Sequence, residues 1–256
     1  TGYSHPKVVD AVRDAAGKFF HICGTDFYYQ TMSDLCEALA TTGIGPSKKR
    51  VFLTNSGTEA VEGAIKLVRN STRRHQIIAF QGAFHGRTYG AMSLTSSKAK
   101  QRASFGPMLP GIHHVPYPDP YRLETGGQPV CKFVIDRIHD LFRRHCSPQD
   151  VAAIVLEPGM QGAAGMLTQP PGYVKRVREL ADRAGTLLIL DEVAMGMGRS
   201  GAMFASESVA LDSLGFEVVR DVAPGEAVYV SRDGEVASRL CAAETELTPC
   251  IFEHVY

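Results

Sequence analysis

The sequence predicts an α/β fold with a mainly parallel sheet that is covered by helices on both faces. Short apolar runs recur along the chain at 51–54, 76–80, 152–156 and 186–190. An amphipathic helix is predicted after the first run and another before the last. Continuous apolar strands that are separated by amphipathic helices are typical of parallel sheets buried on both faces.

The individual elements follow from local patterns. The first strand, 51–54, leads through a turn at 55–58 into a helix over 59–69, where apolar residues recur at helical spacing. The other three runs predict strands of the same kind. The clearest helix is predicted over 171–184, because Pro171 suits its first turn and Gly185 suits its end.

Composition excludes several classes of partner. The 27 basic residues balance 27 acidic ones, and the isoelectric point is about 7.1. Nucleic acids and anionic membranes are recognised by clustered excess Lys and Arg, so neither is expected as a partner. The longest apolar runs, such as 151–156, are far shorter than the roughly 20 residues that span a bilayer. We expect a soluble protein.

The six cysteines are widely spread and form no C-x-x-C pair. This pattern is typical of reduced thiols, and we expect a cytoplasmic protein. Zinc sites built from Cys146 with His145, or from His113 and His114, lack further ligands at metal spacing, so no metal is expected.

Polar groups follow the predicted strands, and ligands of such sheets bind beyond the carboxyl ends of the strands. The first group is Asn55-Ser56-Gly57-Thr58. At a helix start, its N–H groups and hydroxyls either form a phosphate seat or simply cap the helix. The second group contains Phe84 and His85 between glycines. Phe84 either stacks on a planar ligand or fills the core of a turn.

The third group is Glu157-Pro158, followed by a Gly-rich loop, which fits either a pocket wall or a solvated loop. The fourth is Asp191-Glu192-Val193. A carboxylate at the end of so apolar a strand is unfavourable unless it pairs with a cation, a metal or a protonated ring nitrogen. Asp191 is therefore the most informative of these residues.

Together, in this order and spacing, the four groups resemble the class III (omega) pyridoxal-phosphate aminotransferases. The resemblance covers about residues 1–205 and includes 2–6 and the segment Gly198-Arg199-Ser200-Gly201. It implies the large domain of a fold-type I enzyme, here incomplete, with pyridoxal phosphate as cofactor. It also implies an amino donor and a keto acid as substrates, and a homodimer.

The family's roles are implied for the matching positions. Ser56, Gly57 and Thr58 would hold the cofactor phosphate. Phe84 and Val193 would enclose the pyridine ring, with His85 beside them. Asp191 would pair with the protonated ring nitrogen, and Glu157 would line the pocket near ring and substrate.

Two departures from the family pattern matter. Ala194 and the segment 161–166 resemble the diaminopelargonate branch, whereas 21–121 resembles the 4-aminobutyrate and omega-amino acid branch. The family's Schiff-base lysine lies a few tens of residues beyond the Asp191 position, but no lysine follows Lys175. We therefore expect no catalytic lysine and no transamination.

The last residues, 206–256, differ in character from the rest. They carry a charge of −7 against +7 for 1–205. Short β elements are predicted, with turns at Pro224-Gly225 and at Asp233-Gly234, the second suited to a hairpin. This segment resembles the end of the glutaminase domain of glutamine phosphoribosylpyrophosphate amidotransferase. The sequence thus predicts two domains, 1–205 and 206–256, as in a chimera. The alternatives to an aminotransferase are an amidophosphoribosyltransferase fragment and a non-catalytic chimera.

Overall fold

The computed structural model describes residues 4–42, 49–194, 226–230 and 236–240. The chain divides into two compact units, 1–53 and 54–256. The first unit contains helices α1 (Pro6–Lys18) and α2 (Gln30–Thr42). Pro6 begins α1, a position where its missing N–H would have no helical partner, and no residue of α1 is buried.

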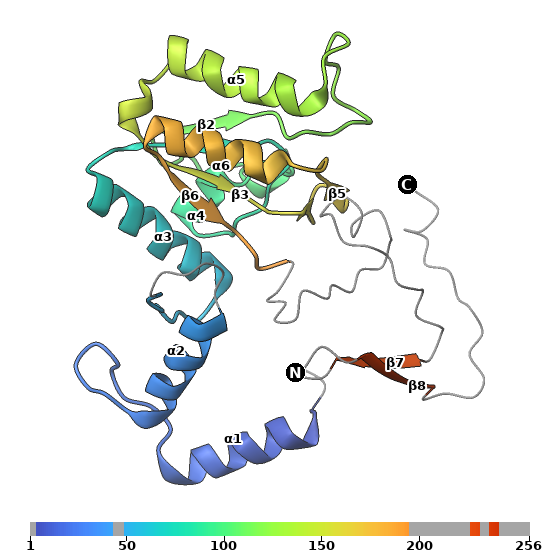
Figure 1. Cartoon of the computed structure of the whole chain (residues 1–256). Coiled ribbons are helices and arrows are strands. Elements are labelled where there is room, and N and C mark those ends of the chain that lie inside the picture. The colour runs from blue at the N-terminus through green and yellow to red at the C-terminus, as the bar shows by residue number, and fades with distance from the viewer. Residues whose placement is uncertain (1–3, 43–48, 195–225, 231–235, 241–256) are drawn as a thin grey trace. The chain divides into compact units, whose positions relative to one another are not determined.

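The second unit is built on a four-stranded parallel sheet with the order β2-β1-β3-β6 (Figure 1). The strands are β1 (Gln76–Phe80), β2 (Ile112–Val115), β3 (Val151–Leu156) and β6 (Leu187–Leu190). The parallel sheet and the strands predicted at 76–80, 152–156 and 186–190 are confirmed to within a residue. Strand β2 was not predicted.

Helices cover both faces of this sheet, as predicted (Figure 1). Helices α5 (Val130–Arg144) and α6 (Tyr173–Ala184) pack with Ile78 and Phe80 on one face. Helices α3 (Gly57–Thr72) and α4 (Tyr89–Leu94) pack with Ile77 and Ala79 on the other. Successive side chains of a strand point to opposite faces, so β1 contributes to both cores.

The helix predicted over 171–184 begins two residues later and ends as expected. Gly172 precedes it in a left-handed conformation, and Gly185 at its end has φ 61° and donates to the Ala181 carbonyl. Short elements complete the unit: the 3₁₀ turns Ala99–Gln101 and Pro148–Asp150, and a small hairpin of β4 (Met160–Gln161) and β5 (Leu167–Thr168). Within the described ranges, no helix is both long and apolar enough to cross a bilayer.

The strand predicted over 51–54 is wrong. These residues have no regular structure, and Phe52 and Leu53 are exposed. An apolar run becomes a strand only where a neighbouring strand accepts its hydrogen bonds. None of the strands in the described part of the chain pairs with 51–54.

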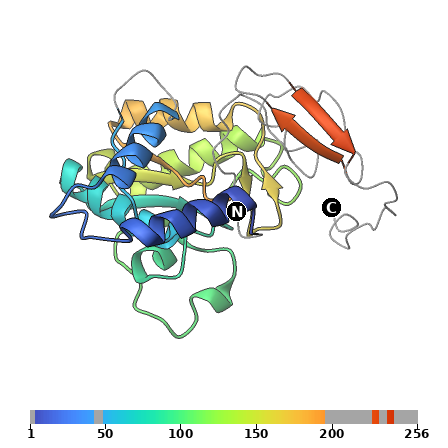
Figure 2. The same ribbon diagram turned by 90° about the horizontal axis from the view of Figure 1, so that it is seen from below.

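An antiparallel hairpin forms near the end of the chain, from β7 (Glu226–Val230) and β8 (Val236–Leu240) (Figure 2). Its register pairs Val230 with Val236, and the predicted turn at Asp233-Gly234 falls between the two strands in sequence. The antiparallel character predicted for this segment is confirmed here. The loop itself and the predicted boundary near residue 205 lie outside the described residues.

Candidate functional site

The first polar group forms the start of helix α3. Ser56 is the N-cap, and its Oγ accepts the N–H of Glu59 at 3.3 Å. The Glu59 carboxylate in turn accepts the N–H of Asn55 at 2.7 Å. The cap interpretation is therefore correct. Because the first turn of a helix has no internal acceptors, the N–H groups of Gly57 and Thr58 remain able to bind an anion.

The second polar group lies against this helix start. The hydroxyls of Thr58 and Thr88 are 2.8 Å apart, and the N–H of Thr88 donates to Thr58 Oγ1 at 3.3 Å. Gly86 has φ +135°, and a β-carbon there would overlap the Thr58 side chain. Only glycine allows the loop to approach α3 so closely.

Glu62 holds this loop in place and was not predicted. Its Oε1 accepts the Thr88 hydroxyl at 2.5 Å and the N–H of Ala91 at 3.0 Å. Glu62 lies four residues after Thr58 on α3, so both side chains are on the same helix face. The four-residue spacing from Thr58 is therefore the sequence signal that could have identified Glu62.

His85 and Asp191 form a buried pair that joins the second and fourth groups. His85 Nδ1 lies 2.8 Å from Asp191 Oδ2, and the two side chains are 0% and 7% exposed. The N–H of His85 donates to Thr95 Oγ1 at 2.9 Å, which orients the loop. His85 Nε2 is buried and has no partner among the described residues.

Glu157 joins the second and third groups. It is 4% exposed, so the solvated-loop interpretation is wrong, and its Oε2 accepts the N–H of Phe84 at 3.1 Å. Burial raises the pKa of this carboxyl above its ordinary value. The nearby Asp191 also raises that pKa, while the Phe84 N–H and His85 act in the opposite direction.

Phe84 and Val193 complete the group of residues suggested by the sequence. The Phe84 side chain is half-buried, and the guanidinium carbon of Arg87 lies 6.0 Å from its ring centroid. Val193 is 72% exposed and lies beside the start of α3, since a β-carbon on Gly57 would be 3.1 Å from its Cγ2. The four polar groups, distant in sequence, are therefore linked at the carboxyl end of the sheet: the second group contacts each of the others, and the first also contacts the fourth.

Comparison with known proteins identifies relatives for most of the chain. The class-III aminotransferase family matches residues 1–216. A 4-aminobutyrate aminotransferase of Escherichia coli is 37% identical over 211 residues, which are 82% of this chain and 48% of the relative. A 5-aminovalerate aminotransferase of Pseudomonas putida is 39% identical over the same shares, 82% and 48%. An acetylornithine aminotransferase of Methanopyrus kandleri is 41% identical over 80% of this chain and 47% of the relative.

Solved structures agree with these relatives. The taurine:2-oxoglutarate aminotransferase of Bifidobacterium kashiwanohense, in complex with pyridoxal phosphate and glutamate, has a TM-score of 0.71 at 30% identity, covering 84% of this chain and 47% of that one. A pyridoxal-phosphate-bound amine transaminase from an uncultivated Pseudomonas species has a TM-score of 0.68 at 26% identity, covering 78% and 47%. The chain thus has the fold-type I architecture and spans about half the length of the relatives it matches. It belongs to the class-III aminotransferase family.

Proposed function

We propose that this chain supplies the pyridoxal-phosphate site of an aminotransferase of the 4-aminobutyrate and omega-amino acid type. Such an enzyme moves an amino group between an amine or amino acid and a keto acid. The observation that carries the proposal is the convergence of four polar groups around the buried His85–Asp191 pair. Among the residues that the structure describes, the buried Nε2 of His85 has no partner, which supports a site that a ligand completes.

The start of α3 fits a phosphate. The N–H groups of Gly57 and Thr58 and the hydroxyl of Ser56 can donate to an anion, and the positive end of the helix dipole favours it. Thr58 Oγ1 is held by Thr88, which fixes its direction. Ser56, Gly57 and Thr58 are the proposed phosphate ligands.

The buried pair fits the ring. A carboxylate that is nearly excluded from water favours a cationic partner, and Asp191 is proposed to accept a hydrogen bond from the pyridine nitrogen, which stays protonated. His85 orients this carboxylate through Nδ1. When bound, pyridoxal phosphate supplies an electron sink for the carbanion that forms when a substrate proton leaves. Phe84 and Val193 are proposed to enclose the ring, with Glu157 facing ring and substrate.

The amino donor is proposed to be a small molecule that carries an amine at one end and a carboxylate at the other. Three curated relatives support this class, because their names refer to 4-aminobutyrate, 5-aminovalerate and acetylornithine. Two copies of the chain are proposed to assemble as a homodimer in the cytoplasm. Because no lysine follows Lys175, we propose that this polypeptide binds the cofactor without catalysing transamination.

Cofactor binding is best tested with 4′-deoxypyridoxine phosphate, which keeps the phosphate and the ring nitrogen but lacks the aldehyde that reacts with surface lysines. Calorimetry should show saturable binding to the wild type. Asp191→Ala should weaken it about tenfold or more, since a hydrogen bond to a charged group is worth roughly 1.5–3 kcal/mol. Asp150→Ala, which removes an exposed carboxylate just before β3, is the control. Absence of saturable binding by the wild type would refute the proposal.

Inactivity is tested separately, by glutamate formation from 2-oxoglutarate and 4-aminobutyrate in the presence of pyridoxal phosphate. We expect none from this polypeptide. Measurable turnover would contradict the proposed lack of catalysis while leaving the proposed site intact.

An unrelated origin is proposed for residues 206–256. Three observations support it: the charge of this segment is opposite to that of 1–205, it contains no lysine, and the family match ends within it, at residue 216. The resemblance of this segment to an amidophosphoribosyltransferase gives the alternative identity, a fragment of that enzyme or a non-catalytic chimera. Sequencing the source gene on both sides separates them: a downstream Lys-Gly loop supports the aminotransferase, and a phosphoribosyl loop supports the alternative.

A further inference from the structure

Two side chains of helix α3, Thr58 and Glu62, contact the same residue of the neighbouring loop, Thr88. Thr88 Oγ1 lies 2.8 Å from Thr58 Oγ1 and 2.5 Å from Glu62 Oε1. The N–H of Thr88 also donates to Thr58 Oγ1 at 3.3 Å, and the N–H of Ala91 donates to Glu62 Oε1 at 3.0 Å. The three side chains therefore form one row of hydrogen bonds.

The direction of each bond in this row follows from the protons that are available. A carboxylate only accepts hydrogen bonds, whereas a threonine hydroxyl donates one proton and accepts with its lone pairs. The proton of Thr88 therefore goes to Glu62, at a distance typical of a hydroxyl that donates to a charged oxygen. The bond between the two hydroxyls must then use the proton of Thr58. The row runs one way, from Thr58 through Thr88 to Glu62.

Two glycines on either side of Thr88 allow this close contact between the loop and α3. A β-carbon on Gly86 would overlap the Thr58 side chain, and a β-carbon on Gly90 would overlap the Glu62 carboxylate. Both glycines are buried. Any side chain at either position would separate the three hydrogen-bonded groups, so the row depends on this local sequence.

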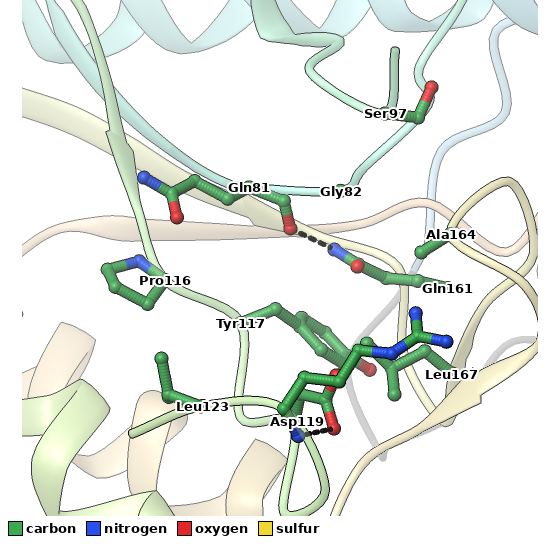
Figure 3. A pocket seen from close by; sticks show the side chains of 11 residues that line it. Gln81, Gly82, Ser97, Pro116, Tyr117, Asp119, Leu123, Gln161, Ala164 and Leu167 are labelled. Atoms are coloured by element: carbon green, nitrogen blue, oxygen red, sulfur yellow. Dashed lines mark hydrogen bonds between the residues drawn. The ribbon is translucent and has the colours of Figure 1, made fainter. Parts of the chain in front are cut away.

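The loop that ends at Thr88 is anchored at its start as well. The Gln81 carbonyl accepts from Gln161 Nε2 at 3.2 Å, as Figure 3 shows, and Gln161 is 0% exposed. Thr88 is thus held in place and would not follow a rotation of the Thr58 side chain. Such a rotation would leave the N–H of Thr88 without its partner. The Thr58 proton is therefore committed to Thr88.

We propose that Glu62 is a positioning residue that withholds the Thr58 proton from the cofactor phosphate. The phosphate then accepts from the N–H groups of Gly57 and Thr58 and from the hydroxyl of Ser56. The Ser56 oxygen accepts the N–H of Glu59, which leaves its own proton to donate. This inference rests on the proposed function, because it assigns the donors of the same phosphate site.

A double-mutant cycle between Thr58 and Glu62 tests the assignment. For each variant, calorimetry gives the affinity for 4′-deoxypyridoxine phosphate relative to that for 4′-deoxypyridoxine, a ratio that isolates the phosphate contacts. Glu62→Met removes the acceptor, so Thr88 donates to Thr58 and the Thr58 proton becomes available to the phosphate. We therefore expect Thr58→Val to lower the ratio about tenfold more in the Glu62→Met background than in the wild type. Any effect of either substitution that does not pass through the other residue cancels in the cycle.

Glu62→Gln is the matched control, because it removes the same charge as Glu62→Met but keeps an oxygen that accepts from Thr88 and Ala91. In the Glu62→Gln background, Thr58→Val should have the effect that it has in the wild type. Ser56→Ala should lower the ratio about tenfold in every background, since its hydroxyl donates to the phosphate in each.

An equal effect of Thr58→Val in the wild type and in the Glu62→Met background would overturn the proposal. So would a Glu62→Gln background that behaves like Glu62→Met, or a ratio that Ser56→Ala leaves unchanged. If Glu62→Met does not fold, Thr88→Val at an exposed position replaces it, because it also frees the Thr58 proton. Absence of binding of both compounds by the wild type would refute the proposed function too, whereas the other adverse results leave the cofactor site intact.

Discussion

Strands β3 and β6 are neighbours that differ sharply in burial. Both are short apolar runs, they pair in parallel, and each is followed directly by a carboxylate. Every residue of β3 is buried, whereas Leu187 and Leu190 of β6 are 42% and 38% exposed. β3 lies between two strands, but β6 pairs with one among the described residues. Similar sequence patterns therefore give different burial when the neighbours differ.

The carboxylates that follow these strands do not share this difference. Glu157 is 4% exposed and Asp191 is 9% exposed, although β6 is far less covered than β3. The loop after β1 accounts for this, because Phe84 binds one carboxylate and His85 binds the other. The site is thus organised by residues 81–88, the loop between β1 and α4, and not by the strands alone. We call this segment the crossing loop.

The largest change in the free energy of unfolding is expected from substitutions on the strands themselves. Leu156 on β3 and Leu190 on β6 are register partners, but only Leu156 is fully buried. Leu156→Ala should lower the free energy of unfolding by about 2–5 kcal/mol, because it leaves a cavity. Leu190→Ala should lower it by less than about 2 kcal/mol. Urea denaturation measures both, and equal losses would contradict the burial difference.

The second-largest expected change in the free energy of unfolding concerns the buried His85–Asp191 pair. His85→Ala, Asp191→Ala and the double variant form a cycle, and we expect a coupling of about 1–3 kcal/mol in the free energy of unfolding. The physical reason is that either single change leaves a buried polar group without its partner. Additive effects in urea denaturation would show that the 2.8 Å contact contributes nothing to stability.

Glu157 should make stability depend on pH. Its raised folded pKa means that the folded state holds the proton more tightly than the unfolded state. Its contribution is therefore present below the ordinary carboxyl pKa and is lost as pH rises through the raised value. Glu157→Gln still accepts the N–H of Phe84 but does not ionise, so it should remove this loss of stability with rising pH. An unchanged slope of unfolding free energy against pH would contradict the assignment.

The smallest effect is expected at Glu62, which holds the crossing loop from α3. Glu62→Ala removes the acceptor of Thr88 and Ala91, and should lower the free energy of unfolding by about 1 kcal/mol. Hydrogen exchange of the Ala91 amide should increase. Exposed Glu179→Ala on α6 is the control, and similar exchange in both variants would argue against the positioning role.

The sequence predicted the sheet where apolar runs were unbroken, as in β1, β3 and β6. It missed β2 because two histidines interrupt the apolar pattern. In the structure His113 Nε2 lies 2.8 Å from Gln76 Oε1, and His114 Nε2 donates to the Leu94 carbonyl at 3.0 Å. Burial lowers the pKa of both imidazoles. Neutral histidines are compatible with a half-buried strand, which an apolar pattern cannot reveal.

The candidate site was predicted where residues directly follow strands, as Glu157 and Asp191 do. Glu62 and Thr95 were missed because they lie within or after helices and act through backbone contacts with a loop. The strand prediction at 51–54 was wrong for a different reason. A strand forms only where a neighbouring strand pairs with it, and the local sequence pattern does not specify that neighbour.

The most direct test of the central claim is amide NMR with 4′-deoxypyridoxine phosphate. The claim is that four distant polar groups form one cofactor site. Addition of the compound should shift the amide signals of Gly57, Thr58, His85 and Val193 together with one saturation curve. 4′-Deoxypyridoxine without phosphate should shift Gly57 and Thr58 much less. Shifts confined to other residues, or separate saturation curves for the four signals, would contradict the account.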